Sequence, residues 1–133
     1  MLDKRKFYIN GKWVAPSKPN DLDVIDPCTE DSVATISLGS KEDTNAAVSA
    51  AKTAFESWKE SSKEERVALL EKLLTIYKKR YSEMVDAISL EMGAPADWSK
   101  DVQTASGQSH IEDFILRLKE FEFDKKFSPE SNN

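Results

Sequence analysis

The chain has 133 residues, which is the length of one domain, and its 19 basic and 24 acidic residues give a net charge of -5. A compact acidic protein repels phosphate backbones, and no apolar run approaches the length of a membrane span or of a signal-peptide core, so we expect neither a nucleic-acid nor a membrane partner. The one cysteine excludes an internal disulfide, and together these absences favour the cytoplasm.

Residues 1–39 predict a small β region. Asn10-Gly11 lies between two β-prone triplets, and this dipeptide favours a tight hairpin because both turn positions need a positive φ. Two further runs of apolar residues, each bounded by turn formers, indicate short strands. The triplets are residues 7–9 and 12–14, and the further strands are residues 22–25 and 32–38.

A helix is predicted from Ser40 to Trp58. Ser40 and Asp43 form a capping-box pair, in which the hydroxyl accepts from an amide of the first turn and the carboxylate bonds back. Alanines then recur at helical spacing, which allows another helix to approach closely. Residues 59–62 separate this helix from the next one.

The next segment, from Ser62 to Gly93, predicts one long helix. Ser62 and Glu65 form a second capping box, and Gly93 is placed to end the helix in a left-handed cap, with Pro95 preventing its continuation. Between them, apolar residues recur in alternating steps of three and four, so we expect a core helix that buries this face. The stripe consists of Val67, Leu70, Leu74, Tyr77, Tyr81, Met84 and Ile88.

A third helix is predicted from about residue 97 to about residue 121. Its two halves present apolar faces that are out of phase, and the polar segment Ser106–His110 lies between them. Either the helix bends there, or the segment faces water or a cavity. The overall expectation is a mostly α fold: three antiparallel helices over residues 40–123, the small N-terminal β region, and a flexible tail over residues 124–133, all in one domain.

Candidate chemical groups are few. Cys28 and His110 are the only thiol and imidazole, and acidic neighbours of Cys28 disfavour a thiolate, so we expect a passive turn residue. His110 lacks partners at metal-ligand spacing; it is either a polar helix residue or lies at a cavity rim. Glu91 lies at the end of the predicted long helix, where a carboxylate interacts unfavourably with the helix dipole. It is either an exposed residue without a role or a residue with a function. The four glycines are too scattered for a phosphate-binding loop.

Together, five segments resemble the N-terminal part of the aldehyde dehydrogenase superfamily, in order and in spacing. They resemble its opening hairpin, its second strand and turn, its first helix, the end of its second long helix, and the segment after its third helix. These segments are residues 7–14, 24–30, 43–58, 89–95 and 121–123.

The resemblance implies oxidation of an aldehyde to an acid with NAD or NADP. In this family a cysteine thiolate attacks the carbonyl, hydride passes to the nicotinamide, and a glutamate activates water. Those residues and the cofactor motifs come later in the family than the point where this chain stops. Residues 90–93 and 107–108 resemble the two catalytic motifs, but the residues that follow do not match. We therefore assign no catalytic, cofactor-binding or metal residue and no cofactor to this chain.

Two further features follow from the resemblance alone. Ile25 and Glu91 match positions that hold a monovalent cation in some relatives, and Ser106–His110 would border the substrate entrance. The first hypothesis is a fragmentary aldehyde dehydrogenase, inactive by itself, whose aldehyde substrate and NAD(P) belong to the full-length parent. The alternative is a stand-alone helical interaction module that forms a homo-oligomer through exposed helix faces.

Overall fold

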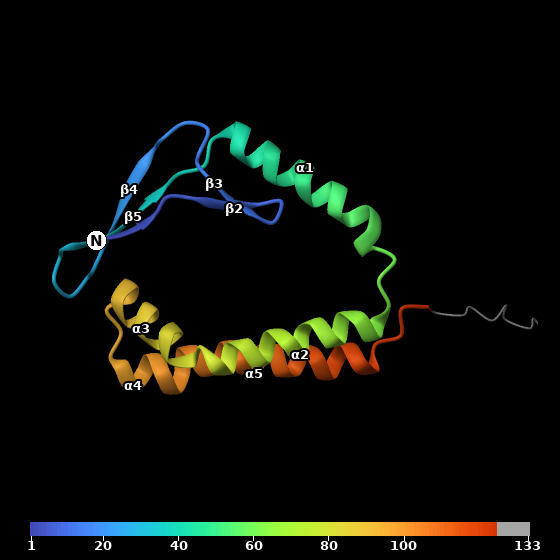
Figure 1. Cartoon of the computed structure of the whole chain (residues 1–133). Coiled ribbons are helices and arrows are strands. Elements are labelled where there is room, and N and C mark those ends of the chain that lie inside the picture. The colour runs from blue at the N-terminus through green and yellow to red at the C-terminus, as the bar shows by residue number, and fades with distance from the viewer. Residues whose placement is uncertain (125–133) are drawn as a thin grey trace, which may run out of the picture.

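A computed structural model describes residues 1–124 and places five strands before the helices (Figure 1). The mostly α fold with a small N-terminal β region is confirmed, and the predicted tail lies outside the described residues except for Asp124. The strands are β1 (Leu2–Lys4), β2 (Phe7–Ile9), β3 (Lys12–Val14), β4 (Asp21–Ile25) and β5 (Ser32–Ser37). The helices are α1 (Lys41–Trp58), α2 (Lys63–Lys79), α3 (Tyr81–Met92), α4 (Ala96–Trp98), the π-helix η1 (Ser99–Thr104) and α5 (Ala105–Glu120).

The predicted hairpin is confirmed. Strands β2 and β3 pair antiparallel around Asn10 and Gly11, whose φ angles of 52° and 74° are the two positive values that the turn needs. A second sheet has the order β1-β5-β4, with β1 parallel and β4 antiparallel to β5. Strand β1 was not predicted, because three residues with two charges show no alternation.

The N-terminus of α1 is fixed by the predicted capping box. The Asp43 carboxylate accepts from the Ser40 amide at 2.9 Å, and Ser40 Oγ accepts from the Asp43 amide at 3.2 Å. The other Asp43 oxygen accepts from the Ser17 amide at 2.9 Å, and the residue is only 8% exposed. The cap therefore also ties α1 to the loop that follows β3.

Stability below pH 5 should depend on this carboxylate. Hydrogen bonds from the Ser40 and Ser17 amides lower the pKa of Asp43 below its ordinary range. The contribution of Asp43 to the free energy of unfolding is therefore fully present above the unfolded-state pKa of about 4. This contribution is lost as the pH falls through the lower folded-state pKa. Urea unfolding at stepped pH should show a smaller acid loss for Asp43→Asn than for the parent chain. Equal losses in both chains would contradict this assignment.

The predicted long helix is two helices. Arg80 leaves the helical region at φ -104° and ψ 19°, which divides the segment into α2 and α3. The Arg80 amide still bonds to the carbonyls of Ile76 and Tyr77, so the polypeptide changes direction without losing its hydrogen bonds. No glycine or proline marks the position, and the apolar stripe continues across it, so the break could not be foreseen from residue types. The predicted cap at Gly93 is present, with φ 64°.

Helices α2 and α3 run antiparallel to the η1 and α5 segment, as predicted for the second and third helices. Two salt bridges of 2.8 Å join α2 to α5. Glu71 of α2 pairs with Lys119 of α5, and Lys78 of α2 pairs with Glu112 of α5. The first helix is not part of this arrangement: α1 packs against β2 instead (Figure 1). The expectation of three helices in one antiparallel bundle is corrected to a helical hairpin with α1 apart from it.

The irregularity of the third helix is a π-helix rather than a bend at Ser106–His110. Residues 99–104 form η1, and Ser106–His110 lie in the regular helix α5 that follows. A π turn takes up more residues than an α turn, so the residues after it are rotated about the helix axis. This rotation accounts for the two out-of-phase apolar faces in the sequence.

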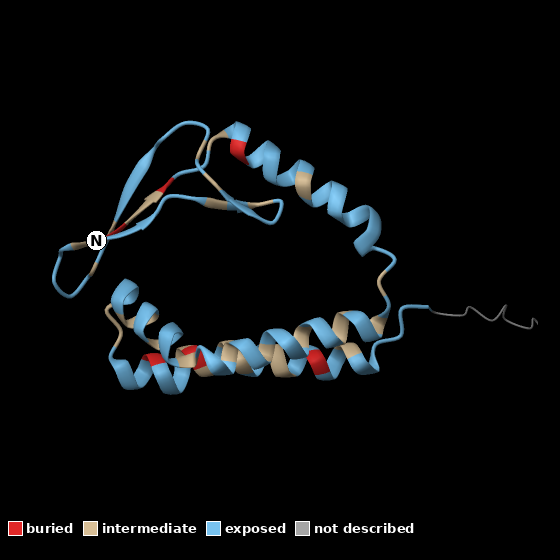
Figure 2. Ribbon diagram, in the orientation of Figure 1, coloured by how far each residue is buried: buried red, intermediate tan, exposed pale blue. Residues whose placement is uncertain are grey.

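Little of the molecule is buried, as Figure 2 shows. Among residues 1–124, Ala34 and Ile115 are the only buried hydrophobic residues, and neither α2 nor α3 contains a buried residue. The stripe that was expected to form the core face of the long helix is only half-buried, and Met84 within it is exposed. None of the described helices is both long enough and apolar enough to cross a membrane.

The exposed area is far larger than a chain of this mass requires. It is 10,726 Å², whereas a folded monomer of 15.0 kDa exposes about 7,000 Å². If the nine residues outside the description were given the area of an extended chain, they would account for about 1,500 Å². An excess of about 2,000 Å² therefore remains, and 22 large hydrophobic residues among residues 1–124 are exposed.

Candidate functional site

A cluster of hydrogen-bonded polar side chains surrounds η1. The Tyr77 hydroxyl donates to the Thr104 carbonyl at 2.9 Å, and the Tyr81 hydroxyl donates to the Lys100 carbonyl. Ser89 and Ser99 are joined through their hydroxyls at 3.0 Å, and both Ser99 and Thr104 are fully buried. A π-helix strains the usual backbone pairing, and side chains of α2 and α3 satisfy two of its carbonyls here.

Gly107 makes room for this cluster. A Cβ on Gly107 would overlap the Tyr77 hydroxyl and lie 3.1 Å from Tyr77 Cζ. Burial raises the pKa of Tyr77, so its hydroxyl stays protonated as a hydrogen-bond donor at neutral pH. The glycine in the predicted break is thus explained by close packing against a tyrosine.

The other residues of the polar segment show no shared site. The Gln108 amide donates to the Glu112 carboxylate at 3.1 Å, one turn further along α5. His110 is exposed and takes part in no hydrogen bond or ion pair among residues 1–124. Its role at a cavity rim, and the lining of a substrate entrance by this segment, stay predictions.

Cys28 lies in a turn that packs on the end of α3. Its amide donates to Asp26 at 2.8 Å, and its thiol donates to the Gly93 carbonyl at 3.7 Å. A Cβ on Gly93 would lie 2.8 Å from Pro27 Cγ and 3.0 Å from Cys28 Sγ. The contacts of Cys28 hold a turn against a helix cap; the thiol has no basic partner in them.

Glu91 and Ile25 lie near the same end of α3. Glu91 is one of the residues around a cavity of about 550 Å³ between the β1-β5-β4 sheet and α3, and Val24 and Leu90 are others. Ile25 ends β4 just after a bulge and is not among the lining residues. No group of three or more His, Cys, Asp or Glu residues suited to a metal occurs in residues 1–124. The cation site at Ile25 and Glu91 therefore stays a prediction.

Tyr77, Tyr81 and Ser99 were not predicted as parts of one cluster. The available signal was the presence of two tyrosines four residues apart in an apolar helix stripe, because a half-buried hydroxyl needs a partner. Their rings contact each other edge to face, with centroids 6.3 Å apart. The partners are backbone carbonyls, which the sequence does not reveal.

Comparisons with known proteins agree on one family. The model of the aldehyde dehydrogenase family matches residues 13–131. A 3-succinoylsemialdehyde-pyridine dehydrogenase from a Pseudomonas species is 37% identical over 126 residues, which are 94% of this chain and 26% of that protein. A putative aldehyde dehydrogenase from Staphylococcus epidermidis is 37% identical over 95% of this chain and 26% of its own length.

Solved structures show the same relationship. An aldehyde dehydrogenase from Bartonella henselae is 53% identical, with a TM-score of 0.95, and is matched over 99% of this chain and 28% of its own. A mutant of aldehyde dehydrogenase C from Pseudomonas syringae, in complex with NAD+ and octanal, is 34% identical with a TM-score of 0.91, over 93% of this chain and 26% of its own. The chain spans about a quarter of the length of these relatives. It belongs to the aldehyde dehydrogenase family, and its fold is that of the family's N-terminal region.

Proposed function

We propose that this chain supplies the N-terminal quarter of an NAD(P)-dependent aldehyde dehydrogenase that oxidises an aldehyde to a carboxylic acid. Its own contribution is structural: the sheet and helices present apolar faces against which the rest of the enzyme packs. The observation that carries this proposal is the excess of about 2,000 Å² of exposed surface, together with only two buried hydrophobic residues in the described range 1–124.

The described residues do not form a dinucleotide site. A phosphate cradle needs glycines grouped where a strand meets a helix, and here three of the four have other uses. Gly11 makes the hairpin turn, Gly93 caps α3, and Gly107 packs against Tyr77. We therefore assign the binding of NAD or NADP, and the reaction itself, to the remaining three-quarters of such an enzyme.

Composition and family membership support the cellular setting that we propose. The acidic net charge of -5 and the single cysteine favour the cytoplasm, with no nucleic-acid or membrane partner. The related enzyme from Pseudomonas syringae binds NAD+, which favours a nicotinamide cofactor for the whole protein without deciding between NAD and NADP.

A chimera with the Bartonella henselae enzyme tests this proposal. The chain would replace the matched 28% of that enzyme, and aldehyde-dependent formation of reduced nicotinamide would be followed by absorbance. We expect activity in the chimera and none in the isolated chain, with the intact Bartonella henselae enzyme as the positive control. Turnover by the isolated chain, or a folded chimera without activity, would contradict the proposal.

A further inference from the structure

The chain has two arms that are joined at one end, as Figure 1 shows. We call residues 1–61, which contain the strands and α1, the sheet arm, and residues 62–120, which contain α2 to α5, the helix arm. The segment that follows α5 leaves the helix arm at this same end. The relative placement of the two arms therefore depends on what fixes the joint between them.

Arg66 of α2 bonds the helix arm to the sheet arm at this joint. Its Nε donates to Ser61 Oγ at 2.9 Å, and its Nη2 donates to the Lys59 carbonyl at 3.2 Å. In the described part of the chain, only one other hydrogen bond joins the two arms, from the Cys28 thiol to the Gly93 carbonyl at the far end of α3. Arg66 is therefore the polar tie between the arms at the joint.

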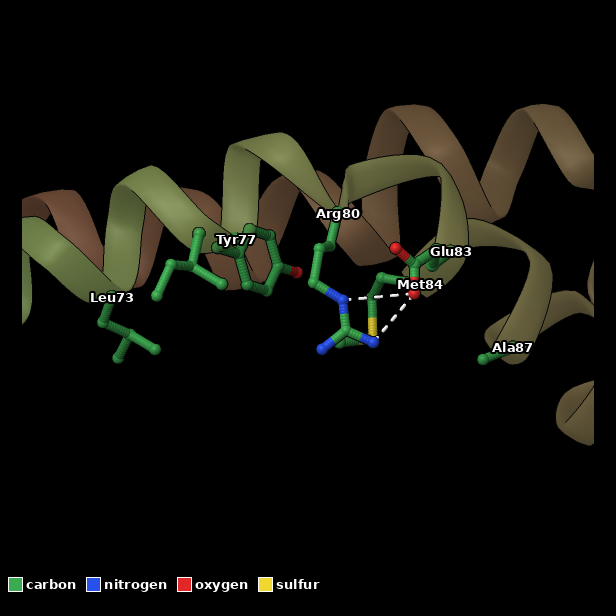
Figure 3. A pocket seen from close by; sticks show the side chains of 7 residues that line it. Leu73, Tyr77, Arg80, Glu83, Met84 and Ala87 are labelled. Carbon is green, nitrogen blue, oxygen red and sulfur yellow. Dashed lines mark hydrogen bonds and ion pairs between the residues drawn. The ribbon is translucent and has the colours of Figure 1, made fainter.

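The same guanidinium meets two aromatic rings. Its central carbon lies 5.8 Å from the ring centroid of Trp58, the last residue of α1, and 5.5 Å from that of Phe123, which follows α5. No carboxylate in the described part of the chain pairs with Arg66. Arg80, by contrast, gives both of its hydrogen bonds to the nearby carboxylate of Glu83 (Figure 3). The planar cation of Arg66 instead connects three separate segments.

The segment after α5 is held at the same place. The chain leaves the helix at Phe121 with an extended backbone, φ -70° and ψ 128°. Lys63, one turn before Arg66 on α2, donates from Nζ to the carbonyls of Lys119 and Phe121 at 3.0 and 3.5 Å. Positive charge is favourable at this carbonyl end of α5. The rings of Phe121 and Phe123 then contact each other edge to face, with centroids 4.9 Å apart.

We propose that Arg66 is a positioning residue, which sets the relative placement of the two arms and the direction in which the chain continues after α5. This inference rests on the proposed function, in which the rest of the enzyme packs on faces of both arms. One body can pack on both arms only if they keep one relative placement, and hinge movement at the joint would disturb it. Lysine would replace Arg66 poorly, because an ammonium group has neither the planar fork nor the flat face.

Spin-label distances between the arms test the joint without any enzyme activity. The labels would be carried by Lys52→Cys on α1 and Lys72→Cys on α2, two exposed positions, in the 133-residue chain with Cys28→Ser. Pulsed electron resonance gives the distribution of distances between the labels. We expect a narrow distribution in this parent and one at least about twofold wider with Arg66→Ala, because the arms then lose their tie at the joint.

Arg117 provides the matched control. Its guanidinium pairs with Asp113 of its own helix and is exposed, so Arg117→Ala should leave the distribution of distances unchanged. Arg66→Lys should give an intermediate width. Circular dichroism would confirm that all variants keep their helices. Equal widths for Arg66→Ala and Arg117→Ala would overturn the inference.

The chimera with the Bartonella henselae enzyme tests the consequence for function. Well below its Tm, Arg66→Ala should lower kcat/KM about tenfold, since small misplacements far from the reacting atoms have large effects on rate. Arg117→Ala should not change it. If Arg66→Ala lowers the Tm but leaves kcat/KM unchanged, Arg66 only stabilises the fold and the inference is wrong. A folded parent chimera without activity would contradict the proposed function, and the spin-label widths would then decide the inference alone.

Discussion

Replacing Gly107 with alanine should lower the free energy of unfolding by about 2–4 kcal/mol, although alanine is the better helix former by about 1 kcal/mol. The new methyl group would overlap the Tyr77 hydroxyl, and Tyr77 is fixed by its hydrogen bond to the Thr104 carbonyl. Relief of the overlap requires the ring to move, which breaks that hydrogen bond to the fully buried Thr104. Urea unfolding of both chains measures the difference.

A double-variant cycle separates this cause from general damage to α5. Tyr77→Phe removes the obstructing oxygen, so Gly107→Ala should cost at least about 1 kcal/mol less in that background than in the parent chain. Gly39→Ala is the matched control, because a Cβ there lies 3.8 Å from Phe7 and 4.0 Å from Asp43, in ordinary contact. Equal costs of Gly107→Ala in both backgrounds would show that the tyrosine hydroxyl does not set the requirement for glycine.

The elements that could be predicted are those decided by neighbours in the sequence. The Asn10-Gly11 turn and the capping boxes at Ser40 and Ser62 involve residues within four positions of one another, and all three are present. The left-handed cap at Gly93 belongs to the same class. Turn and cap chemistry is local, so these features follow from residue type and spacing alone.

The features that could not be predicted depend on distant partners. The break at Arg80 and the π-helix η1 occur where side chains of α2 and α3 bond to backbone carbonyls of the third helix, and no breaking residue marks either one. The pairing of β1 with β5 joins segments about thirty residues apart. Hydrophobic periodicity identified the stripe on the long helix but not how far it is buried, because burial depends on what covers the stripe.

The candidate site also combines local features that could be predicted with long-range contacts that could not. The position of Cys28 in a turn could be anticipated from Asp26-Pro27 before it, whereas its contact with Gly93 spans 65 residues and could not. The polar segment Ser106–His110 was recognised as unusual from its composition. Its explanation, room for Tyr77 at Gly107, needed the relative placement of α2 and α5.

Gly93→Ala should lower the free energy of unfolding by about 2–5 kcal/mol. Two costs combine at this position. The backbone has φ 64°, a left-handed conformation that costs about 1–2 kcal/mol for a residue with a Cβ. That Cβ would also lie 2.8 Å from Pro27 Cγ and 3.0 Å from Cys28 Sγ, so the turn must move away from the end of α3.

Gly11 offers the control that separates the two costs. It has φ 74°, and a Cβ added there would have no neighbouring atom within 4 Å, so Gly11→Ala carries the backbone cost alone. In urea unfolding, the difference between the two variants should therefore measure the contact of the 26–31 turn with α3. Adding Pro27→Ala to Gly93→Ala should recover part of that difference, since it removes the nearest atom. If the two glycine variants lose equal stability, the turn does not pack on α3, and the placement of Cys28 beside Gly93 is wrong.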